Sequence, residues 1–301
     1  MKFEQAMTLY LKNYASTKTH TSRARRNDAA YFLAAWGNKN LRVVTVSTIT
    51  EWRDRRLQIE APATVMRRLA TLRHFYSTLG DKNPAREVPF PILPETTPDW
   101  FTVSESARLR EVACVGTSTF IQLRSALILE LGLSQGLRCK EIRLLTAAQI
   151  DLYEKKILKA WGKGSRYFTK PLHSRVAELL ERYYRYRELE IAKHDAGFLT
   201  LTPQKKLSYP VIVSTYGAKQ AHPRTYEMSE KTIWRTIRRI GDLANVPRSR
   251  THRLRHAFVK RITDACGILA AAEHARHSNP KTTMRYAQSS FDESRNSIEH
   301  A

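Results

Sequence analysis

Three separate stretches of the chain carry side chains whose types suit chemistry on a phosphodiester. They read Gly136-Leu137-Arg138-Cys139-Lys140-Glu141, His252-Arg253-Leu254-Arg255-His256 and His277 followed by a late Tyr286. A guanidinium group is planar, always protonated and able to donate two parallel hydrogen bonds to phosphate oxygens. Arg138 and Arg255 could therefore hold a phosphodiester and stabilise the charge that develops in a pentacovalent transition state. Either arginine alone would more simply be an ion pair or a nonspecific phosphate contact, because the chain has 51 basic residues.

A nucleophile and proton-transfer groups are also present. Tyr286 can form a covalent link and can later depart from it as a leaving group. The unperturbed pKa of its phenol is about 10, and neighbouring cations favour the ionised form, the phenolate. Lys163, flanked by two glycines in a predicted tight turn, could swing over the phosphate and protonate the leaving 5′ oxygen as a general acid. His252 and His277 would hydrogen-bond the phosphate or exchange protons with the tyrosine. Taken singly, each signal is weak, since the chain has 13 tyrosines and Gly-Lys-Gly fits any β-turn.

The histidines raise a metal site as an alternative. His252 and His256 are four residues apart on one predicted helix, and His274 and His277 follow later. No glutamate follows His252 as in a zinc protease helix, and the two flanking arginines would repel a divalent cation. We therefore expect no metal and no cofactor, and we expect His256 and His274 to be structural or to contact phosphate.

The charge balance indicates a polyanionic partner. The 301 residues carry a formal net charge of +23, and the basic excess is +8 over residues 1–95 and +15 over residues 96–301. Nucleic acid is the simplest polyanion that touches both parts, although a basic surface kept for solubility is an alternative. The hydrophobic content of 42% favours a folded protein over a disordered basic tail.

Cysteine usage and hydropathy predict the compartment. Cys114, Cys139 and Cys266 are odd in number and far apart, so neither a disulfide framework nor a CxxC metal knuckle is expected. The start lacks the apolar core of a signal peptide, and no apolar run approaches the roughly 18 residues of a membrane span. We expect a reducing location, the bacterial cytoplasm, in association with the nucleoid.

Apolar periodicity predicts that most of the chain is helical. Residues three and four apart predict helices over 3–14, 29–36, 46–57, 62–79, 103–115, 120–135, 138–145, 174–194, 231–243, 251–263, 268–275 and 280–287. Residues 148–170 alternate and break at two glycines, which predicts two or three short strands. The predicted fold class is therefore mainly α with a small antiparallel β-sheet, an α+β fold. Residues 197–228 contain three prolines and receive no assignment.

A proline-rich stretch predicts the domain boundary. Asn83-Pro84-Ala85 is followed by four prolines, at positions 89, 91, 94 and 98. Proline fixes φ and lacks an N–H donor, so neither a helix nor a central strand is expected to cross this stretch. We predict a helical domain over 1–82, a linker over 83–100 and a second domain over 101–301.

The order and spacing of the motifs resemble the tyrosine recombinase, or phage integrase, family. Gly-Leu-Arg-x-x-Glu opens a helix, and the lysine of the predicted turn, Lys163, comes 25 residues after Arg138. The motif His-x-Leu-Arg-His follows, and Tyr286 lies nine residues after His277. The resemblance extends over the whole chain, because the helical first part, Asn-Pro-Ala and the proline-rich link look like the family's SAM-like core-binding domain and its connection to the catalytic domain. It implies a DNA-binding domain over 1–82 and a catalytic domain with a C-terminal tail over 101–301.

The resemblance also implies a reaction. Tyr286 would attack the scissile phosphate, giving a 3′-phosphotyrosine and a free 5′-hydroxyl, and the 5′-hydroxyl of a partner strand would reverse the step. Because the covalent link retains the bond energy, neither metal nor ATP would be required. A homotetramer on two double-stranded DNA sites would exchange strands through a Holliday junction, in the integration, excision or resolution of a mobile element, with accessory DNA-bending or directionality factors as further partners.

The same resemblance implies the roles of the other residues. Arg138 and Arg255 would bind the phosphate. Lys163 would be the general acid, and His252 and His277 would assist proton transfer. Three alternatives stay open: a noncatalytic DNA-binding protein of the same fold, a type IB topoisomerase or telomere resolvase, and a metal-dependent nuclease.

The chain departs from the family pattern in three places. The third motif usually reads Leu-Gly-His, but here it is Ala275-Arg276-His277, so Arg276 would add a phosphate contact or reshape the helix entry. The stretch 197–228 is longer than the usual connection, and we predict a DNA or partner contact from Lys205, Lys206, Lys219 and Arg224. Fifteen residues follow Tyr286, with Phe291 and Ile298 as the apolar anchors through which this tail would dock on a neighbouring protomer.

Overall fold

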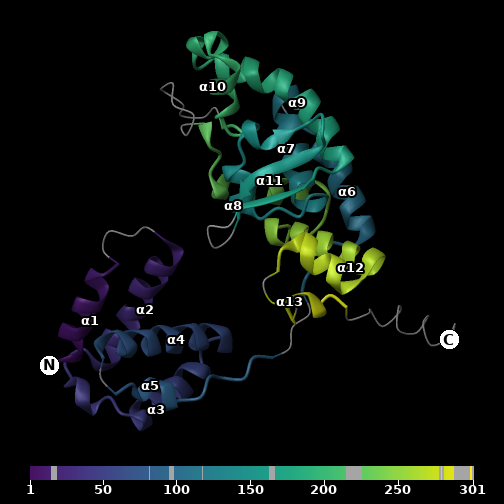
Figure 1. Cartoon of the computed structure of the whole chain (residues 1–301). Coiled ribbons are helices and arrows are strands. Elements are labelled where there is room, and N and C mark those ends of the chain that lie inside the picture. The colour runs from purple at the N-terminus through teal and green to yellow at the C-terminus, as the bar shows by residue number, and fades with distance from the viewer. Residues whose placement is uncertain are drawn as a thin grey trace. The chain divides into compact units, whose positions relative to one another are not determined.

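The computed structural model describes residues 1–14, 19–80, 82–94, 98–116, 118–162, 167–214, 226–277, 279, 281–287 and 299, apart from the side chains of His20 and Lys281. The chain divides into two compact units, Met1–Thr96 and Thr97–Ala301. Helices α1 to α5 build the first unit, and the remaining helices with a three-stranded sheet build the second (Figure 1).

The first unit is helical, as its apolar periodicity predicts. It contains α1 (Phe3–Lys12), α2 (His20–Trp36), the 3₁₀ turn η1 (Leu41–Val43), α3 (Val46–Leu57), α4 (Pro62–Leu79) and α5 (Pro84–Glu87). Helix α2 begins at residue 20 rather than 29, because the Thr19 side chain caps it by accepting from the Ser22 N–H although its first turns are polar. Pro62 opens α4, and Gly80, at φ 74°, ends it in the left-handed conformation that favours glycine.

Aromatic side chains form the core of the first unit. Phe3, Phe32, Trp36, Trp52 and Phe75 are buried and lie ring against ring. The first residues of the predicted linker join this core rather than leaving it: the buried Ala85 and Val88 pack there, and the Arg73 guanidinium donates hydrogen bonds to both of their carbonyls. The roles predicted for the two domains stay predictions.

The second unit combines helices with one small sheet. Its elements are α6 (Val103–Ala113), α7 (Thr119–Leu133), α8 (Cys139–Leu144), η2 (Ala147–Gln149), β1 (Ile150–Asp151), β2 (Lys156–Trp161), β3 (Tyr167–Pro171), α9 (Ser174–Ala192), η3 (Ala196–Thr200), α10 (Pro203–Leu207), α11 (Glu230–Leu243), α12 (Thr251–Ala275) and α13 (Lys281–Met284). The fold class predicted from the sequence is confirmed.

The sheet is antiparallel, with β2 between β1 and β3. Ile150 pairs with Ile157, and Trp161 pairs with Tyr167 across the turn that carries Lys163. Residues 163–166 of that turn lie outside the described residues. The pairing of β2 with β3 nevertheless defines which two strand ends the turn connects.

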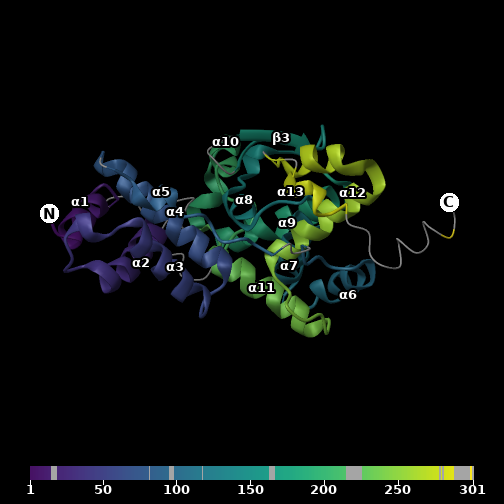
Figure 2. The same ribbon diagram turned by 90° about the horizontal axis from the view of Figure 1, so that it is seen from below.

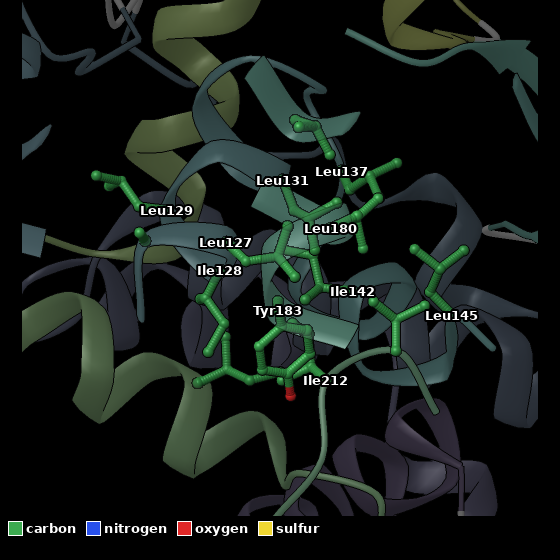
Figure 3. Close-up of a cluster of buried hydrophobic side chains, with 14 of the residues drawn as sticks. Leu127, Ile128, Leu129, Leu131, Leu137, Ile142, Leu145, Leu180, Tyr183 and Ile212 are labelled. Atoms are coloured by element: carbon green, nitrogen blue, oxygen red, sulfur yellow. The ribbon is translucent and has the colours of Figure 1, made fainter. Parts of the chain in front are cut away.

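Helix α7 is the centre of the second unit. It contacts α6, α8, α9, α11 and α12, so its side chains are buried around most of its circumference. This burial confirms the prediction from its apolar composition. The cluster includes Leu127, Leu131, Leu180, Tyr183 and Ile212 (Figure 3).

Helix α12 carries the second motif and leads to the third. The predicted break between two helices appears as a kink at Gly267, whose φ of 82° and ψ of 172° are not helical. The helix ends at Ala275, and the next residue, Arg276, has left-handed dihedral angles. The short α13 lies beside α12 in both views (Figures 1 and 2).

Within the described part of the chain, we find no helix with the length and apolarity needed to cross a bilayer. Cys114, Cys139 and Cys266 are free thiols.

Candidate active site

The first motif is held by a capping arrangement at the start of α8. Arg138 precedes the helix, and its backbone N–H donates to Glu141 Oε2 at 2.9 Å while its guanidinium donates to Glu141 Oε1 at 3.0 Å. Glu141 is only 3% exposed. Burial alone would raise its pKa, but Arg276 and then Arg138 hold the pKa below its ordinary value, so the carboxylate is charged and orients the arginine.

A glycine makes the turn before Arg138 possible. Gly136 has a φ of 67°, and a Cβ at this position would lie 2.3 Å from Phe258 Cδ1. The close packing of the turn on α12 therefore requires a residue without a side chain.

Arg255 joins this turn to the end of α12. It is 3% exposed, and its guanidinium donates to the carbonyls of Gly136 and Ala275. Burial, and next the charge of Arg138, lower the pKa of Arg255 to about 9, so the side chain is still protonated at neutral pH. The two predicted arginines thus lie close enough for their charges to oppose each other, as in a site made for an anion.

The charges of Arg138 and Arg255 also act on two histidines, His277 and His252. The pKa of His277 falls to about 4 through burial and then through Arg255 and Arg138, and its Nδ1 shares a 2.8 Å hydrogen bond with Thr283 Oγ1. His252 lies more exposed, and partial burial followed by the same two arginines lowers its pKa as well. Both rings are therefore neutral at neutral pH and able to accept a hydrogen bond or a proton.

Tyr286 lies in the same site. It is 3% exposed, and its ring is tilted against Trp100 with centroids 6.3 Å apart. Burial raises the pKa of the phenol to about 12, although the charges of Arg255 and Arg285 act in the opposite direction. The hydroxyl is therefore protonated at neutral pH, and it forms a hydrogen bond with His256 Nδ1.

Five of the six predicted site residues thus lie in one region, built from the start of α8, the first turns of α12 and the segment around α13. The sixth, Lys163, lies outside the described residues. Sequence reasoning missed the contact that His256 makes with the tyrosine. Its position one turn after His252 on the same helix face was the available signal.

Arg276 makes contacts that the sequence did not predict, and its predicted phosphate contact stays a prediction. At φ 55° it keeps the left-handed helix end that a glycine would form. Its guanidinium donates to Glu141 Oε2 at 2.6 Å and lies 3.4 Å from the centroid of the Phe168 ring. The extra cation is therefore matched by a buried carboxylate, and the end of α12 is linked to the start of α8.

Lys170 is a buried site neighbour that the sequence analysis did not single out. It is 9% exposed, donates to the Gln135 carbonyl at 2.7 Å and lies over the Phe258 ring at 4.8 Å. Burial, then Arg276 and Arg255, lower its pKa to about 7. The alternation of β3 was the missed signal, since Phe168 and Lys170 are two residues apart and share the inner face of the strand.

A basic stripe on α11 also went unrecognised in the sequence. One face of the helix is buried through Ile233, Ile237 and Ile240. The opposite face exposes Lys231, Trp234, Arg235, Arg238 and Arg239, and we call these five residues the α11 stripe. Helix α11 runs along the outside of the second unit in Figure 2. Clustered cations with an aromatic ring on one helix face are typical of nucleic-acid contacts.

The remaining predictions fall partly outside the described residues. Lys205 and Lys206 are described on α10, whereas Lys219, Arg224 and both predicted tail anchors, Phe291 and Ile298, are not. Among the residues that are described, no three His, Cys, Asp or Glu side chains form a group able to hold a metal ion.

Comparison with known proteins gives the family. Residues 100–293 match the model of the phage integrase family. Tyrosine recombinase XerC of Thermodesulfovibrio yellowstonii is 25% identical over 287 residues, which cover 92% of this chain and 88% of the relative. Tyrosine recombinase XerD of Bifidobacterium longum is 26% identical over 235 residues, covering 75% and 71%.

Solved structures show the same fold. The Tn1549 transposon integrase in complex with transposon right end DNA superposes with a TM-score of 0.70 at 17% identity, covering 100% of this chain and 99% of that one. A lambda integrase dimer bound to a COC′ core site gives a TM-score of 0.68 at 15% identity, covering 96% and 77%. The chain therefore belongs to the phage integrase, or tyrosine recombinase, family and is a site-specific recombinase.

Proposed function

We propose that this recombinase cleaves and rejoins DNA strands through a 3′-phosphotyrosine intermediate at Tyr286. One observation carries the proposal. The charge of the buried Arg255 acts on the pKa of the buried Tyr286 phenol, and the charge of Arg138 acts on the pKa of Arg255. These three side chains come from segments far apart in the sequence, and a site for an anion next to a nucleophile explains their convergence.

Arg138 and Arg255 would bind the nonbridging oxygens of the scissile phosphate. A guanidinium has five N–H donors, so the two carbonyl bonds of Arg255 leave others for the substrate. Because Arg255 and Tyr286 are each 3% exposed, the phosphate reaches them only when neighbouring side chains move. His252, which is more exposed, and His277 are the neutral groups that would hydrogen-bond the phosphate.

Lys163 would protonate the leaving 5′ oxygen. Its role rests on its place in the turn between β2 and β3 and on the spacing of the motifs, not on any contact. The loss of a proton by the phenol and the gain of one by the 5′ oxygen balance the step, and neither requires a metal ion.

The proposed substrate is double-stranded DNA, bound by a homotetramer that holds two sites. The α11 stripe and the net charge of +23 support a long polyanion rather than a small phosphate ester. The integrases of similar fold that are in complex with transposon right end DNA and bound to a COC′ core site support DNA in particular.

A nicked suicide duplex tests the proposal. We expect the protein, incubated without metal, to form a covalent adduct that survives a denaturing gel. Tyr286→Phe should abolish the adduct and leave noncovalent binding intact, whereas Tyr153→Phe, at a tyrosine that is 93% exposed, should change nothing. Arg138→Ala should slow cleavage by about a hundredfold to a thousandfold, the usual effect of losing one transition-state donor.

Two results would contradict the proposal. An adduct that persists in Tyr286→Phe would assign the nucleophile elsewhere. Tight, site-specific binding with no adduct from any nicked duplex would favour the noncatalytic DNA-binding alternative.

A further inference from the structure

We propose that His256 is a catalytic residue, which takes the proton of Tyr286 as the phenol oxygen attacks the phosphate. The inference rests on the proposed function and assigns to this site a base that neither the motif spacing nor the family match names. It differs from the expectation that His252 and His277 carry out proton transfer.

The contact itself is the first argument. The Tyr286 hydroxyl and His256 Nδ1 share a hydrogen bond, and the two rings lie 5.6 Å apart at an interplanar angle of 43°. Among the described residues, His256 is the only hydrogen-bond partner of that hydroxyl. Since Tyr286 is only 3% exposed, the hydrogen-bonded His256 is the nearest group that can take the proton of the phenol.

The other two histidines are engaged elsewhere. His277 uses its Nδ1 on Thr283. His252 lies edge-on against the His256 ring, with centroids 4.5 Å apart, and is the more exposed of the two. This arrangement leaves His252 and His277 for the phosphate and puts His256 behind the nucleophile.

The protonation states fit an acceptor. Burial, followed by His252, Arg255 and Arg250, lowers the pKa of His256 to about 4, while Asp99 acts in the opposite direction. The imidazole is therefore neutral at neutral pH, and with its hydrogen on Nε2 it presents a lone pair at Nδ1. The phenol keeps its proton at rest because burial raises its pKa to about 12.

The proton moves when bond formation makes the phenol acidic. As the bond between Tyr286 Oη and phosphorus forms, the Oη–H bond breaks and its proton goes to Nδ1 of His256. The P–O5′ bond breaks, and the leaving oxygen receives a proton from the general acid, proposed to be Lys163. In the rejoining step His256 returns its proton to the departing phenolate. The negative phosphate next to the site stabilises the imidazolium that exists between the two steps.

Substitutions at His256 separate proton acceptance from simple positioning. His256→Asn puts an amide oxygen near the place of Nδ1, so it can accept the hydrogen bond but cannot take the proton. We expect single-turnover cleavage of a nicked duplex to fall by about a hundredfold or more in His256→Asn, close to the fall in His256→Ala, with DNA affinity unchanged. His194→Asn, at an exposed histidine that follows α9, is the matched control and should cleave like the unaltered protein.

A more acidic phenol provides the decisive readout. A fluorinated tyrosine at position 286 needs less help to lose its proton, so we expect it to restore cleavage by His256→Asn about tenfold or more. A substrate with sulfur in place of the 5′ bridging oxygen has a leaving group that needs no proton. It should restore Lys163→Ala and not His256→Asn.

The outcomes are distinct. Cleavage by His256→Asn at nearly the normal rate, or no rescue by the fluorinated tyrosine, overturns the role of His256 while the proposed function stands. If the unaltered protein forms no adduct, both proposals fail. If His256→Asn does not fold, as judged by its thermal unfolding, His256→Gln takes its place, with the same expected loss and the same rescue.

Discussion

At the scale of single residues, the site is organised by one buried carboxylate among several cations. Glu141 accepts hydrogen bonds from Arg138 and from Arg276, while Arg255 and Lys170 donate to backbone carbonyls of the turn that precedes Arg138. Each of these cations is thereby held in place by an oxygen of the protein. Prearranged donors of this kind cost little reorganisation when charge develops in the transition state.

The buried histidines predict how stability depends on pH. His256 and His277 have pKa values of about 4 in the folded chain, below the ordinary value of 6.5, so between these two pH values the unfolded chain binds more protons. The free energy of unfolding should therefore fall as pH drops from about 6.5 to about 4, and this contribution should be constant above that window. Urea unfolding at a series of pH values measures the effect.

The double substitution of both histidines by asparagine is the matching control. Its unfolding free energy should fall less steeply over the same pH window. If the unfolding free energy of the double variant fell as steeply as that of the unaltered protein, other groups would be responsible for the pH dependence.

At the scale of elements, the end of α12 combines an unfavourable backbone conformation with a favourable ion pair. Arg276 has a φ of 55°, which an L residue adopts at a cost, while its guanidinium contacts Glu141. Both Arg276→Gly and Arg276→Ala remove the ion pair, but only glycine relieves the backbone. We expect the glycine variant to be more stable by about 1 kcal/mol, measured by chemical unfolding. Equal stabilities would show that the left-handed conformation is not kept in the variants.

The packing of α7 on α12 gives a second prediction at this scale. A Cβ at Gly132 would lie 2.6 Å from Leu254 Cδ1 and 2.8 Å from Leu254 Cβ. Alanine is the better helix former, yet this overlap should outweigh its propensity, so Gly132→Ala should lower the free energy of unfolding by about 1 to 2 kcal/mol.

The double variant Gly132→Ala with Leu254→Ala tests the cause. The space left by Leu254 should accept the new methyl group. The loss of unfolding free energy in the double variant should therefore be smaller than the sum of the losses in the two single variants. Simple additivity would place the strain elsewhere.

At the scale of the whole molecule, positive charge is spread over both units, with excesses of +8 and +15. Replacing Arg235 and Arg239 of the α11 stripe by glutamine should weaken DNA binding and reduce the slope of log affinity against log salt by about 1 for each phosphate that is no longer bound. Cleavage at saturating DNA should be unchanged, because the stripe is proposed to bind DNA and not to take part in the reaction. Binding titrations at several salt concentrations, with Arg175→Gln on the exposed start of α9 as control, measure it. An unchanged salt slope would remove α11 from the interface.

The sequence by itself determined most of the helices, the small sheet and the identity of the motif residues. Helical and strand periodicities are local, since each is set by neighbours within about four residues, and a break such as Gly267 is visible in the same way. The fold class and the family could therefore be predicted. For the same reason the polar start of α2 was missed, because a cap and tertiary packing support it rather than its periodicity.

Only the tertiary structure decided how the motif residues are paired. His256 meets a tyrosine 30 positions away, Arg276 meets a glutamate 135 positions away, and Lys170 donates to a carbonyl 35 positions away. No local pattern encodes these pairs, because each depends on how α8, β3 and α12 pack together. Burial in that packing also sets the pKa values of His256 and Tyr286, so the chemistry of the site is a property of the folded chain rather than of its motifs.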